Sequence, residues 1–209
     1  MYKPEHFTET DREAINDFIE ANPFMTIMGH DGEKCYATQI PVMTEQREDV
    51  LYIKGHVSRY SDHYPVLAKN SEVLGLFTGP HCYVSASWYT KRGQASTWNY
   101  MSVQVRGSMR WFNENETMEL VRELTHQYEN GQENPELLED MPGDYVSEHV
   151  KAIAGFEITV TSLDATFKLS QNRDDESYRN IVTQLMATDD IQGIMVAGEM
   201  MKLRPTLFE

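Results

Sequence analysis

The alternation of apolar and polar residues predicts a mainly β chain of antiparallel strands with helices around them. In strands that alternate in this way, one face packs on a core and the other meets solvent. The predicted strands are 24–28, 35–43, 50–54, 72–78, 82–88, 97–112 and 155–163, the last continuing toward 173. Turn signals separate several of them, including Gly29-His30-Asp31-Gly32 and Gly79-Pro80.

Helical spacing of apolar residues predicts helices before, within and after the strands. Thr10 and Glu13 form a capping-box pattern ahead of a helix that ends near Asn22-Pro23. A short helix is expected after Pro65. Further helices are predicted around Met118–Tyr128, and at 145–153, 174–186 and 190–202.

The stretch 79–100 predicts a hairpin rich in aromatic rings and small hydroxyls. Its first strand carries Tyr83 and Trp88, and its second begins at Thr97-Trp98-Asn99-Tyr100. Ring faces beside polar groups suit a flat conjugated ligand with a polar tail. The alternative is an ordinary hairpin at the edge of a β-rich core.

The polar segment 55–64 is a candidate anion site. A loop that leads into a helix can present unpaired backbone N–H groups to an anion. Here His56, Ser58, Arg59 and Ser61 could add side-chain donors for a phosphate. The alternative is a solvated loop, since the segment has no glycine-rich cradle.

Two other groups of polar residues could serve the same ligand. Gln104 and Arg106 share a strand face with Trp98 and Tyr100, and could equally be the exposed face of a barrel strand. The densest cluster of donors in the chain consists of Lys168, Ser170, Gln171, Asn172 and Arg173. Taken alone, the residues indicate a β-barrel-like protein that could hold a phosphorylated aromatic ligand.

The charge balance argues against direct DNA binding. The 209 residues include 33 acidic and 18 basic side chains, a net charge of −15, with no basic patch and no DNA-binding motif. Many acidic residues fall between Asn113 and His149, which we interpret as solvated surface. The chain lacks an apolar span and a signal-like start, so a cytoplasmic location away from membranes is expected.

The sequence offers little that points to metal or nucleophilic chemistry. Cys35 and Cys82 lack metal-type spacing and are expected to be buried small hydrophobes. The seven histidines are scattered, and motifs for nucleotide cradles or hydrolase nucleophiles are absent. We therefore predict no metal site and assign no catalytic residue.

Several motifs, taken in order, resemble the PaiB family. They are GPHCYVSASWY, TWNY, GFEITV and KLSQNR, the last followed by a helix with an acidic start. The resemblance extends over nearly the whole chain. Members of this family are FMN-binding split-barrel proteins often labelled negative transcriptional regulators. Val103-Gln104-Val105-Arg106-Gly107 is similar to the wider group that includes pyridoxamine phosphate oxidases.

The resemblance implies an α+β, mainly β fold: an antiparallel FMN-binding split β-barrel with peripheral helices and a helical C-terminus. From its length the chain is expected to form one domain over 1–209, or one domain with an appended helical piece. The expected parts are barrel strands in 1–112, an acidic helical insertion at 113–153, a final strand at 154–173 and C-terminal helices at 174–209. The resemblance also implies a homodimer with FMN at the subunit interface. The implied cofactor residues are His56, Ser58, Arg59 and Ser61 for the phosphate, Thr97, Trp98 and Asn99 nearer the ring or ribityl chain, and Lys168, Ser170, Gln171, Asn172 and Arg173 from the partner subunit. Gln104, which could serve a ligand's carbonyl edge, completes the candidate cofactor residues.

One departure from the family pattern falls in the phosphate segment. The family usually has His-x-Ala-Arg-Ala-Asn-Pro, whereas this chain has Ser61 and Asp62 in place of the asparagine and the proline. An aspartate beside a phosphate weakens binding by like-charge repulsion unless it points away.

Three functions follow from these observations. The first is FMN-dependent electron or hydride transfer. The second is transcriptional regulation, acting indirectly or without bound flavin. The third is haem binding or haem degradation, for which His56, His63 and His81 are the candidate iron ligands.

Overall fold

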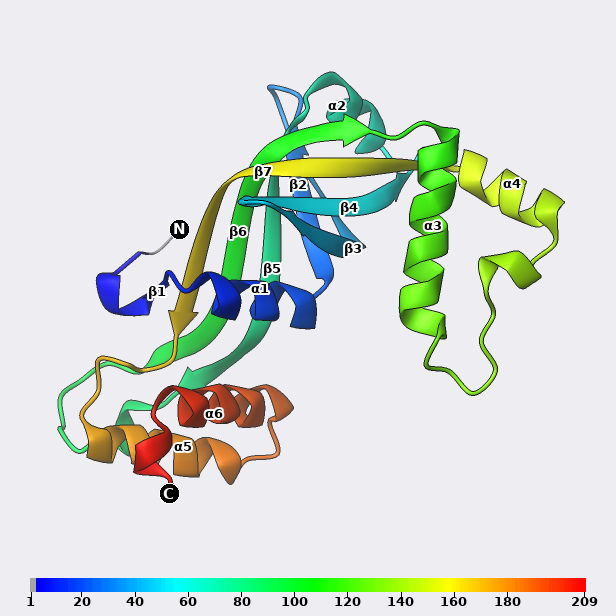
Figure 1. Cartoon of the computed structure of the whole chain (residues 1–209). Helices are drawn as coiled ribbons and strands as arrows, with labels where there is room; N and C mark the ends of the chain where they lie inside the picture. The colour runs from blue at the N-terminus through cyan, green and yellow to red at the C-terminus, as the bar shows by residue number, and fades with distance from the viewer. Residues whose placement is uncertain (1–2) are drawn as a thin grey trace. The chain divides into compact units, whose positions relative to one another are not determined.

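A computed structural model describes residues 3–209 and confirms a mainly β, antiparallel fold with helices at its periphery (Figure 1). The sheet order is β1-β7-β4-β3-β2-β5-β6, and β6 also pairs with β7. The strands are β1 (Thr8–Glu9), β2 (Phe24–His30), β3 (Cys35–Arg47), β4 (Val50–Ser58), β5 (Glu72–Val84), β6 (Thr97–Trp111) and β7 (Ile153–Lys168). The α-helices are α1 (Arg12–Ala21), α2 (Tyr64–Lys69), α3 (Glu114–Glu129), α4 (Gly143–Lys151), α5 (Asp175–Met186) and α6 (Ile191–Leu203).

The chain divides into two compact units, which we describe separately. The barrel unit comprises Glu20–Phe77 and Val105–Leu163. The helical unit comprises Thr78–Gln104, Asp164–Glu209 and the described part of Met1–Ile19. Strands β5, β6 and β7 each contribute one segment to each unit.

In the barrel unit, six strands close on themselves. The pairings run from β6 to β5, β5 to β2, β2 to β3, β3 to β4 and β4 to β7. The pairing of β7 with β6 then closes the barrel. Closure depends on Gly107, because a Cβ at this position would lie 2.3 Å from the carbonyl oxygen of Thr159. Only a glycine lets the two backbones approach this closely. The interior is filled by inward-facing side chains such as Ile27, Ile53 and Ile158, none of which is exposed.

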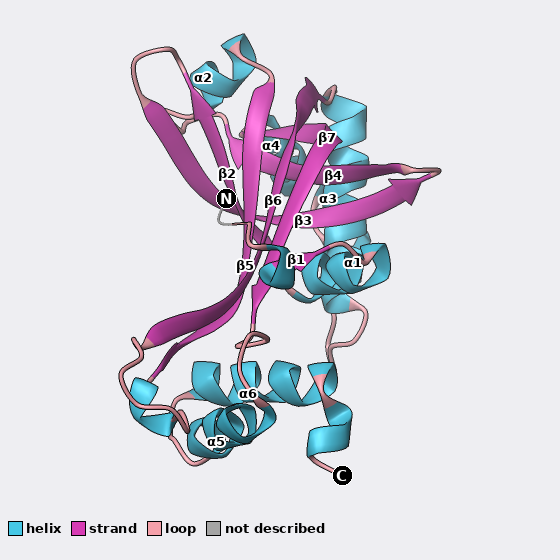
Figure 2. Ribbon diagram, turned by 90° about the vertical axis from the view of Figure 1, so that its left-hand side faces the viewer, coloured by secondary structure: helices cyan, strands magenta, loops and turns pink. Residues whose placement is uncertain are grey.

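The insertion between β6 and β7 forms α3 and α4, which lie beside each other in Figures 1 and 2. Asn113 caps α3 through a complete capping box with Glu116. The insertion has a small apolar core of its own, consisting of Leu138, Val146 and Val150 with Met118, Val121 and Met141 packed against it.

In the helical unit, α5 and α6 pack against each other. Tyr178 of α5 is fully buried, and its hydroxyl donates to the carbonyl oxygen of Met200 in α6 at 2.9 Å. Burial raises the pKa of Tyr178 to about 12, although the positive charge of Arg204 opposes the shift. On α1, the ring of Phe18 contacts that of Phe167 at the end of β7.

The predicted hairpin is present, but its limits differ from the prediction. β5 passes through Gly79-Pro80 without turning. Both residues are buried, and the alternation of buried and exposed residues shifts by one position there. Proline is tolerated inside a strand at such an irregular point. Trp88 lies in a short 3-10 helix, Ala86–Trp88, rather than in the strand.

Three smaller predictions were also wrong. Asp11, and not Thr10, accepts a hydrogen bond from the Glu13 amide at the start of α1. β7 ends at Lys168, so residues 169–173 form a turn rather than the continuing strand. Cys35 is exposed, while Cys82 is buried, and burial raises the pKa of the Cys82 thiol to about 12.

Candidate functional site

The outward face of β4 leads into the predicted phosphate segment of the barrel unit. Gly55 and Val57 point into the barrel, so His56 and Ser58 face outward. β4 ends at Ser58, and a five-residue turn connects it to α2. The strand thus places His56, Ser58 and Arg59 consecutively at one rim of the barrel.

Arg59 is held in a fixed position by three contacts. Its backbone N–H donates to the carbonyl oxygen of Ala152 at 2.9 Å, and its side-chain Nε donates to that of Ile153 at 2.8 Å. Nη1 donates to the hydroxyl of Tyr64 at 2.7 Å. Among the described residues Nη2 has no hydrogen-bond partner, and the residue is exposed. A positioned guanidinium with one open edge is suited to a phosphate.

The two serines of this segment are largely committed to the turn. The Ser58 hydroxyl oxygen accepts from the Tyr60 amide at 3.2 Å. The Ser61 hydroxyl donates to the Ser58 carbonyl oxygen at 2.9 Å and accepts from the Tyr64 amide at 3.2 Å. These bonds shape the turn that carries Arg59.

The start of α2 does not supply the backbone donors expected there. Tyr64 donates its amide to Ser61, Pro65 has no N–H, and Val66 and Leu67 both donate to the carbonyl oxygen of His63. The first-turn amides are therefore used, and anion binding at this rim depends on side chains.

His56 carries a buried ring nitrogen without a partner. Its Nδ1 is inaccessible and makes no hydrogen bond within the part of the chain described. His56 pairs in register with Gly155 of β7, and α3 covers this point, since a Cβ on Gly155 would meet Thr117 Oγ1 at 2.8 Å. Desolvation by burial lowers the pKa of His56. An unused polar atom at this inaccessible point fits a buried water molecule.

Asp62 lies in the electrostatic environment of the β2–β3 hairpin. Burial lowers the pKa of His63, and the negative charge of Asp62 opposes that shift. The pKa of Tyr36 on β3 is raised mainly by its hydrogen bond to Asp31, and the charge of Asp62 adds to it. His63 itself is buried, and its Nδ1 lies 2.9 Å from the hydroxyl of Thr38. This burial makes His63 unsuitable as an iron ligand at the surface.

In the helical unit, strand parity separates the three residues predicted to lie near the flavin ring. Trp98 faces outward and is 55% exposed, whereas Asn99 faces inward and is fully buried. Asn99 Nδ2 donates to Ser170 Oγ at 3.0 Å, and the Ser170 hydroxyl lies 3.1 Å from Asn99 Oδ1. Asn99 and Ser170 are thus paired with each other inside the helical unit.

The other members of the 168–173 donor cluster mostly shape the turn before α5. Lys168 donates to the hydroxyl of Thr97 and, at 2.8 Å, to the carbonyl oxygen of Trp98. Gln171 accepts from the Leu169 amide at 2.7 Å. Arg173 donates to Gln94 and lies over the ring of Tyr89 at 3.9 Å. Asn172 is exposed and has no such contact among residues 3–209.

An aromatic patch is exposed on the hairpin of the helical unit. Tyr83 is 49% exposed, and its ring centre lies 6.2 Å from that of Trp98. The ring centre of His81 also lies near that of Trp98, at 6.4 Å. Gln104 faces outward further along β6 and is half-buried. The predicted grouping of rings on one surface is therefore present in Trp98, Tyr83 and His81.

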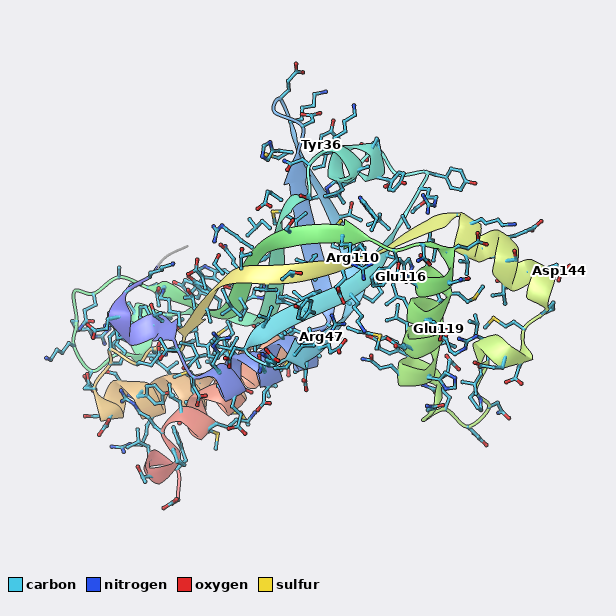
Figure 3. The ribbon with its side chains drawn as sticks, turned by 45° about the horizontal axis from the view of Figure 1, so that its top comes forward. Tyr36, Arg47, Arg110, Glu116, Glu119 and Asp144 are labelled. Carbon is cyan, nitrogen blue, oxygen red and sulfur yellow. The ribbon has the colours of Figure 1, made fainter. Side chains whose placement is uncertain are left out.

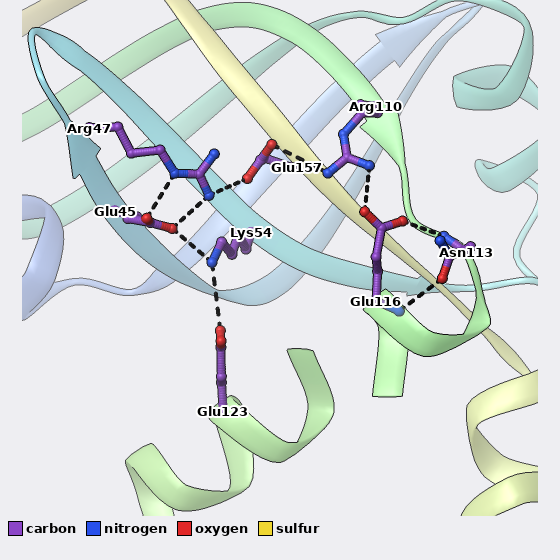
Figure 4. A network of polar contacts seen from close by, with 8 residues as sticks. All are labelled: Glu45, Arg47, Lys54, Arg110, Asn113, Glu116, Glu123 and Glu157. Atoms are coloured by element: carbon purple, nitrogen blue, oxygen red, sulfur yellow. Dashed lines mark hydrogen bonds and ion pairs between the residues drawn. The ribbon is translucent and has the colours of Figure 1, made fainter. Parts of the chain in front are cut away.

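The sequence did not reveal a charged cavity in the barrel unit. It has a volume of about 220 Å³ and is lined by Arg47, Lys54, Arg110, Phe112, Glu116, Glu119, Leu120, Glu123 and Glu157. Figure 3 labels Arg47, Arg110, Glu116 and Glu119 of this lining. Glu157 is buried between Arg47, at 2.7 Å, and Arg110, at 3.6 Å (Figure 4). The cavity has no sequence signal of its own, because its lining comes mainly from strands β3, β4, β6 and β7 and from helix α3, which only the fold brings together.

The charges around this cavity already neutralise one another. Glu45 contacts Arg47 and Lys54, and mainly its hydrogen bond to Arg47 lowers the Glu45 pKa to about 2. Glu116 pairs with Arg110 at 2.7 Å (Figure 4). A phosphate would have to displace these carboxylates, so the cavity suits the anion less well than the rim at Arg59.

Comparison with known proteins gives both a sequence match and a fold match. A family model described as “Putative FMN-binding domain” matches residues 1–162. The protease synthase and sporulation protein PAI 2 of Bacillus subtilis is 34% identical over 185 residues, covering 88% of this chain and 89% of that protein.

The solved structures share the fold at low sequence identity. A flavocytochrome from Azotobacter vinelandii has a TM-score of 0.58 at 13% identity, covering 80% of this chain and 72% of the other. The FAD and heme binding protein from Mycobacterium smegmatis has a TM-score of 0.55 at 14% identity, with coverages of 77% and 73%. These likenesses confirm the predicted split-barrel fold. None of the helices in residues 3–209 combines the length and apolar character needed to cross a bilayer.

Proposed function

The chain belongs to this family of FMN-binding domains, which confirms the family resemblance and the cofactor, FMN. From this premise we propose that Arg59 and His56 hold the FMN phosphate. The observation that carries the proposal is the open edge of the Arg59 guanidinium, which Ile153 and Tyr64 hold in place. His56 lies three residues before Arg59 and belongs to β4; its Nδ1 is buried beneath α3, so its contact with the phosphate would be made through the other ring nitrogen. Ser58 and Ser61 shape the turn, and any hydrogen bond that their hydroxyls do not use in the turn is available to the phosphate.

FMN would supply electron or hydride transfer, and this chain would supply binding and orientation. Trp98, which is exposed on the helical unit, offers a ring face of the kind that stacks on a conjugated ligand. Lys168 is fixed beside Thr97, and burial, followed by the positive charge of Arg173, lowers the Lys168 pKa. We propose Thr97, Trp98, Gln104, Lys168, Asn172 and Arg173 as further cofactor contacts and Asn99, Ser170 and Gln171 as the residues that position them.

The protein is proposed to act as a cytoplasmic homodimeric flavoprotein oxidoreductase. A role in transcription would then be indirect, through the state of the flavin, because the net charge of −15 repels the DNA backbone.

The decisive experiment is an absorption spectrum of the purified protein before and after addition of FMN and desalting. We expect about one flavin per subunit. Arg59→Ala should weaken FMN binding by roughly 10- to 100-fold, the loss of a charged hydrogen-bond partner. Arg179→Ala is the matched control, since Arg179 is exposed on α5. Equal retention of FMN by both variants would refute the proposed phosphate site.

A further inference from the structure

His63, just before α2 in the barrel unit, is a buried polar residue that the proposed phosphate site does not use. Only 1% of it is exposed, and side chains of the β2–β3 hairpin surround its ring. The ring stacks on that of Tyr36, with the centres 5.9 Å apart and the planes inclined by 19°. Its Nδ1 lies 2.9 Å from the hydroxyl of Thr38. Two residues of β3 therefore fix the ring by stacking and by a hydrogen bond.

The seat of the His63 ring depends on Gly29 of β2. Gly29 pairs in register with Tyr36. A Cβ at Gly29 would lie 3.2 Å from His63 Nε2 and 2.8 Å from a methyl group of Leu67. The glycine thus leaves room for the ring and for α2. His63 Nε2 is itself buried without a hydrogen-bond partner in the described chain, so the bond to Thr38 is the one that orients the ring.

A short series of contacts connects His63 to Arg59. The carbonyl oxygen of His63 accepts from two amides of the first turn of α2, at 3.0 and 3.1 Å, and so starts that helix. Tyr64 follows directly, and its ring packs edge-on against Trp111 with the centres 5.2 Å apart. The Tyr64 hydroxyl accepts from Arg59 Nη1 at 2.7 Å. His63 thus fixes the backbone that carries Tyr64, and Tyr64 holds the guanidinium of Arg59.

We infer that His63 is a positioning residue for the FMN phosphate, because through Tyr64 it keeps the Arg59 guanidinium in the orientation that leaves Nη2 open. The inference rests on the phosphate site proposed above. It gives the β2–β3 hairpin a part in cofactor binding, although none of the hairpin residues is proposed to touch FMN. A turn that moves presents the guanidinium correctly for only a fraction of the time, and the apparent affinity falls by that fraction.

Thr38→Val tests the inference away from the ligand. The variant keeps the shape of the side chain and removes the hydroxyl that orients His63. We expect FMN affinity, measured by quenching of flavin fluorescence, to fall about three- to tenfold. Riboflavin, which lacks the phosphate, should bind the variant and the wild type equally. Thr26→Val is the matched control, since Thr26 lies on the opposite face of the same hairpin, and should bind FMN as the wild type does.

A double-mutant cycle shows whether the effect passes through Arg59. His63→Phe keeps a ring against Tyr36 but cannot bond to Thr38, and should lower FMN affinity about tenfold. In an Arg59→Ala background the same change should have little effect, because the guanidinium that it positions is gone. His63→Asn, whose side-chain amide can bond to Thr38, should restore FMN affinity to within about threefold of the wild type.

Three results would overturn the inference. The first is an FMN affinity unchanged by both Thr38→Val and His63→Phe. The second is an equal loss of riboflavin binding, and the third is additive losses from His63→Phe and Arg59→Ala, since either would mean that His63 supports the fold and not the guanidinium. Failure of the phosphate site itself gives a different result, because Arg59→Ala would then bind FMN as tightly as the wild type.

Discussion

Asn99 and Ser170 hold each other in a buried pair, with Asn99 Nδ2 3.0 Å from Ser170 Oγ and Asn99 Oδ1 3.1 Å from the same oxygen. Ser170 makes this contact from a left-handed backbone conformation, with φ of 61°. Residues other than glycine and asparagine rarely adopt that conformation, so the pair fixes the turn between β7 and α5 at some conformational cost.

We expect Asn99→Ala to lower the free energy of unfolding by about 2 kcal/mol, because it leaves Ser170 buried without its partner. Urea denaturation followed by circular dichroism measures the change. Gln104→Ala, on the outward face of the same strand, should cost less than about 1 kcal/mol. Equal costs for the two variants would show that the Asn99–Ser170 pair has no special role.

Closure of the barrel depends on Gly107. We expect Gly107→Ala to destabilise the protein by several kcal/mol, because the new Cβ would overlap the Thr159 carbonyl oxygen, a backbone atom that cannot rotate away. Gly131→Ala is the control, since a Cβ there meets nothing within 4 Å. Thermal unfolding of both variants distinguishes them, and a Gly107→Ala protein as stable as the wild type would refute the close contact of β6 with β7.

Arg47 is expected to contribute more to stability than an ordinary surface arginine. It donates to Glu45 and to the buried Glu157, and its guanidinium lies 4.3 Å from the centre of the Tyr52 ring. Arg47→Ala should cost about 2–3 kcal/mol, because Glu157 then loses its closest cation. Arg122→Ala removes two exposed ion pairs and should cost no more than about 1 kcal/mol. Denaturant unfolding of the two variants is the test.

The stability of the barrel unit should fall as the pH drops from neutral into the mildly acidic range. Burial lowers the pKa of both His56 and His63 below the ordinary value of 6.5. The unfolded chain therefore binds protons at these histidines that the folded chain excludes. Their contribution to the free energy of unfolding is fully present above pH 6.5 and is lost as the pH falls through the folded-state pKa values. The lowered pKa values of Asp31 and Glu45, each about 2, reduce stability only at more acidic pH, where these carboxylates become protonated.

Denaturation midpoints between about pH 5 and pH 8 measure this effect. We expect His56→Gln to flatten the profile relative to the wild type, because the variant lacks the buried group whose pKa burial lowers. An unaltered slope in His56→Gln would mean that His56 is protonated equally in both states.

Much of the fold was predictable because strand alternation and helix spacing are local signals. The alternation at Met101, Val103 and Val105 located the core face of β6 correctly. The same parity, extended two residues toward the start of the strand, places Asn99 on the core face and Trp98 on the opposite one. The continuity of β5 through Gly79-Pro80 was not predictable, because two turn-forming residues in succession were tolerated only through tertiary burial.

The candidate site was less predictable than the fold for a physical reason. A donor-rich stretch such as 168–173 has the same composition whether it binds a ligand or satisfies its own backbone. Only the partners of Gln171 and Ser170 show that these side chains fix a turn. At Arg59, by contrast, the structure shows which edge of the guanidinium remains open, and composition alone contains no such information.

The insertion that carries α3 and α4 leaves and rejoins the barrel at adjacent points, because the Phe112 amide donates to the carbonyl oxygen of Gly155 at 2.8 Å. The roughly forty residues between them thus form a loop whose ends are already joined, and changing its length alters closure entropy only slowly. With a small apolar core of its own, this segment can diverge or be replaced as a module while the strand pairing of the barrel is inherited unchanged.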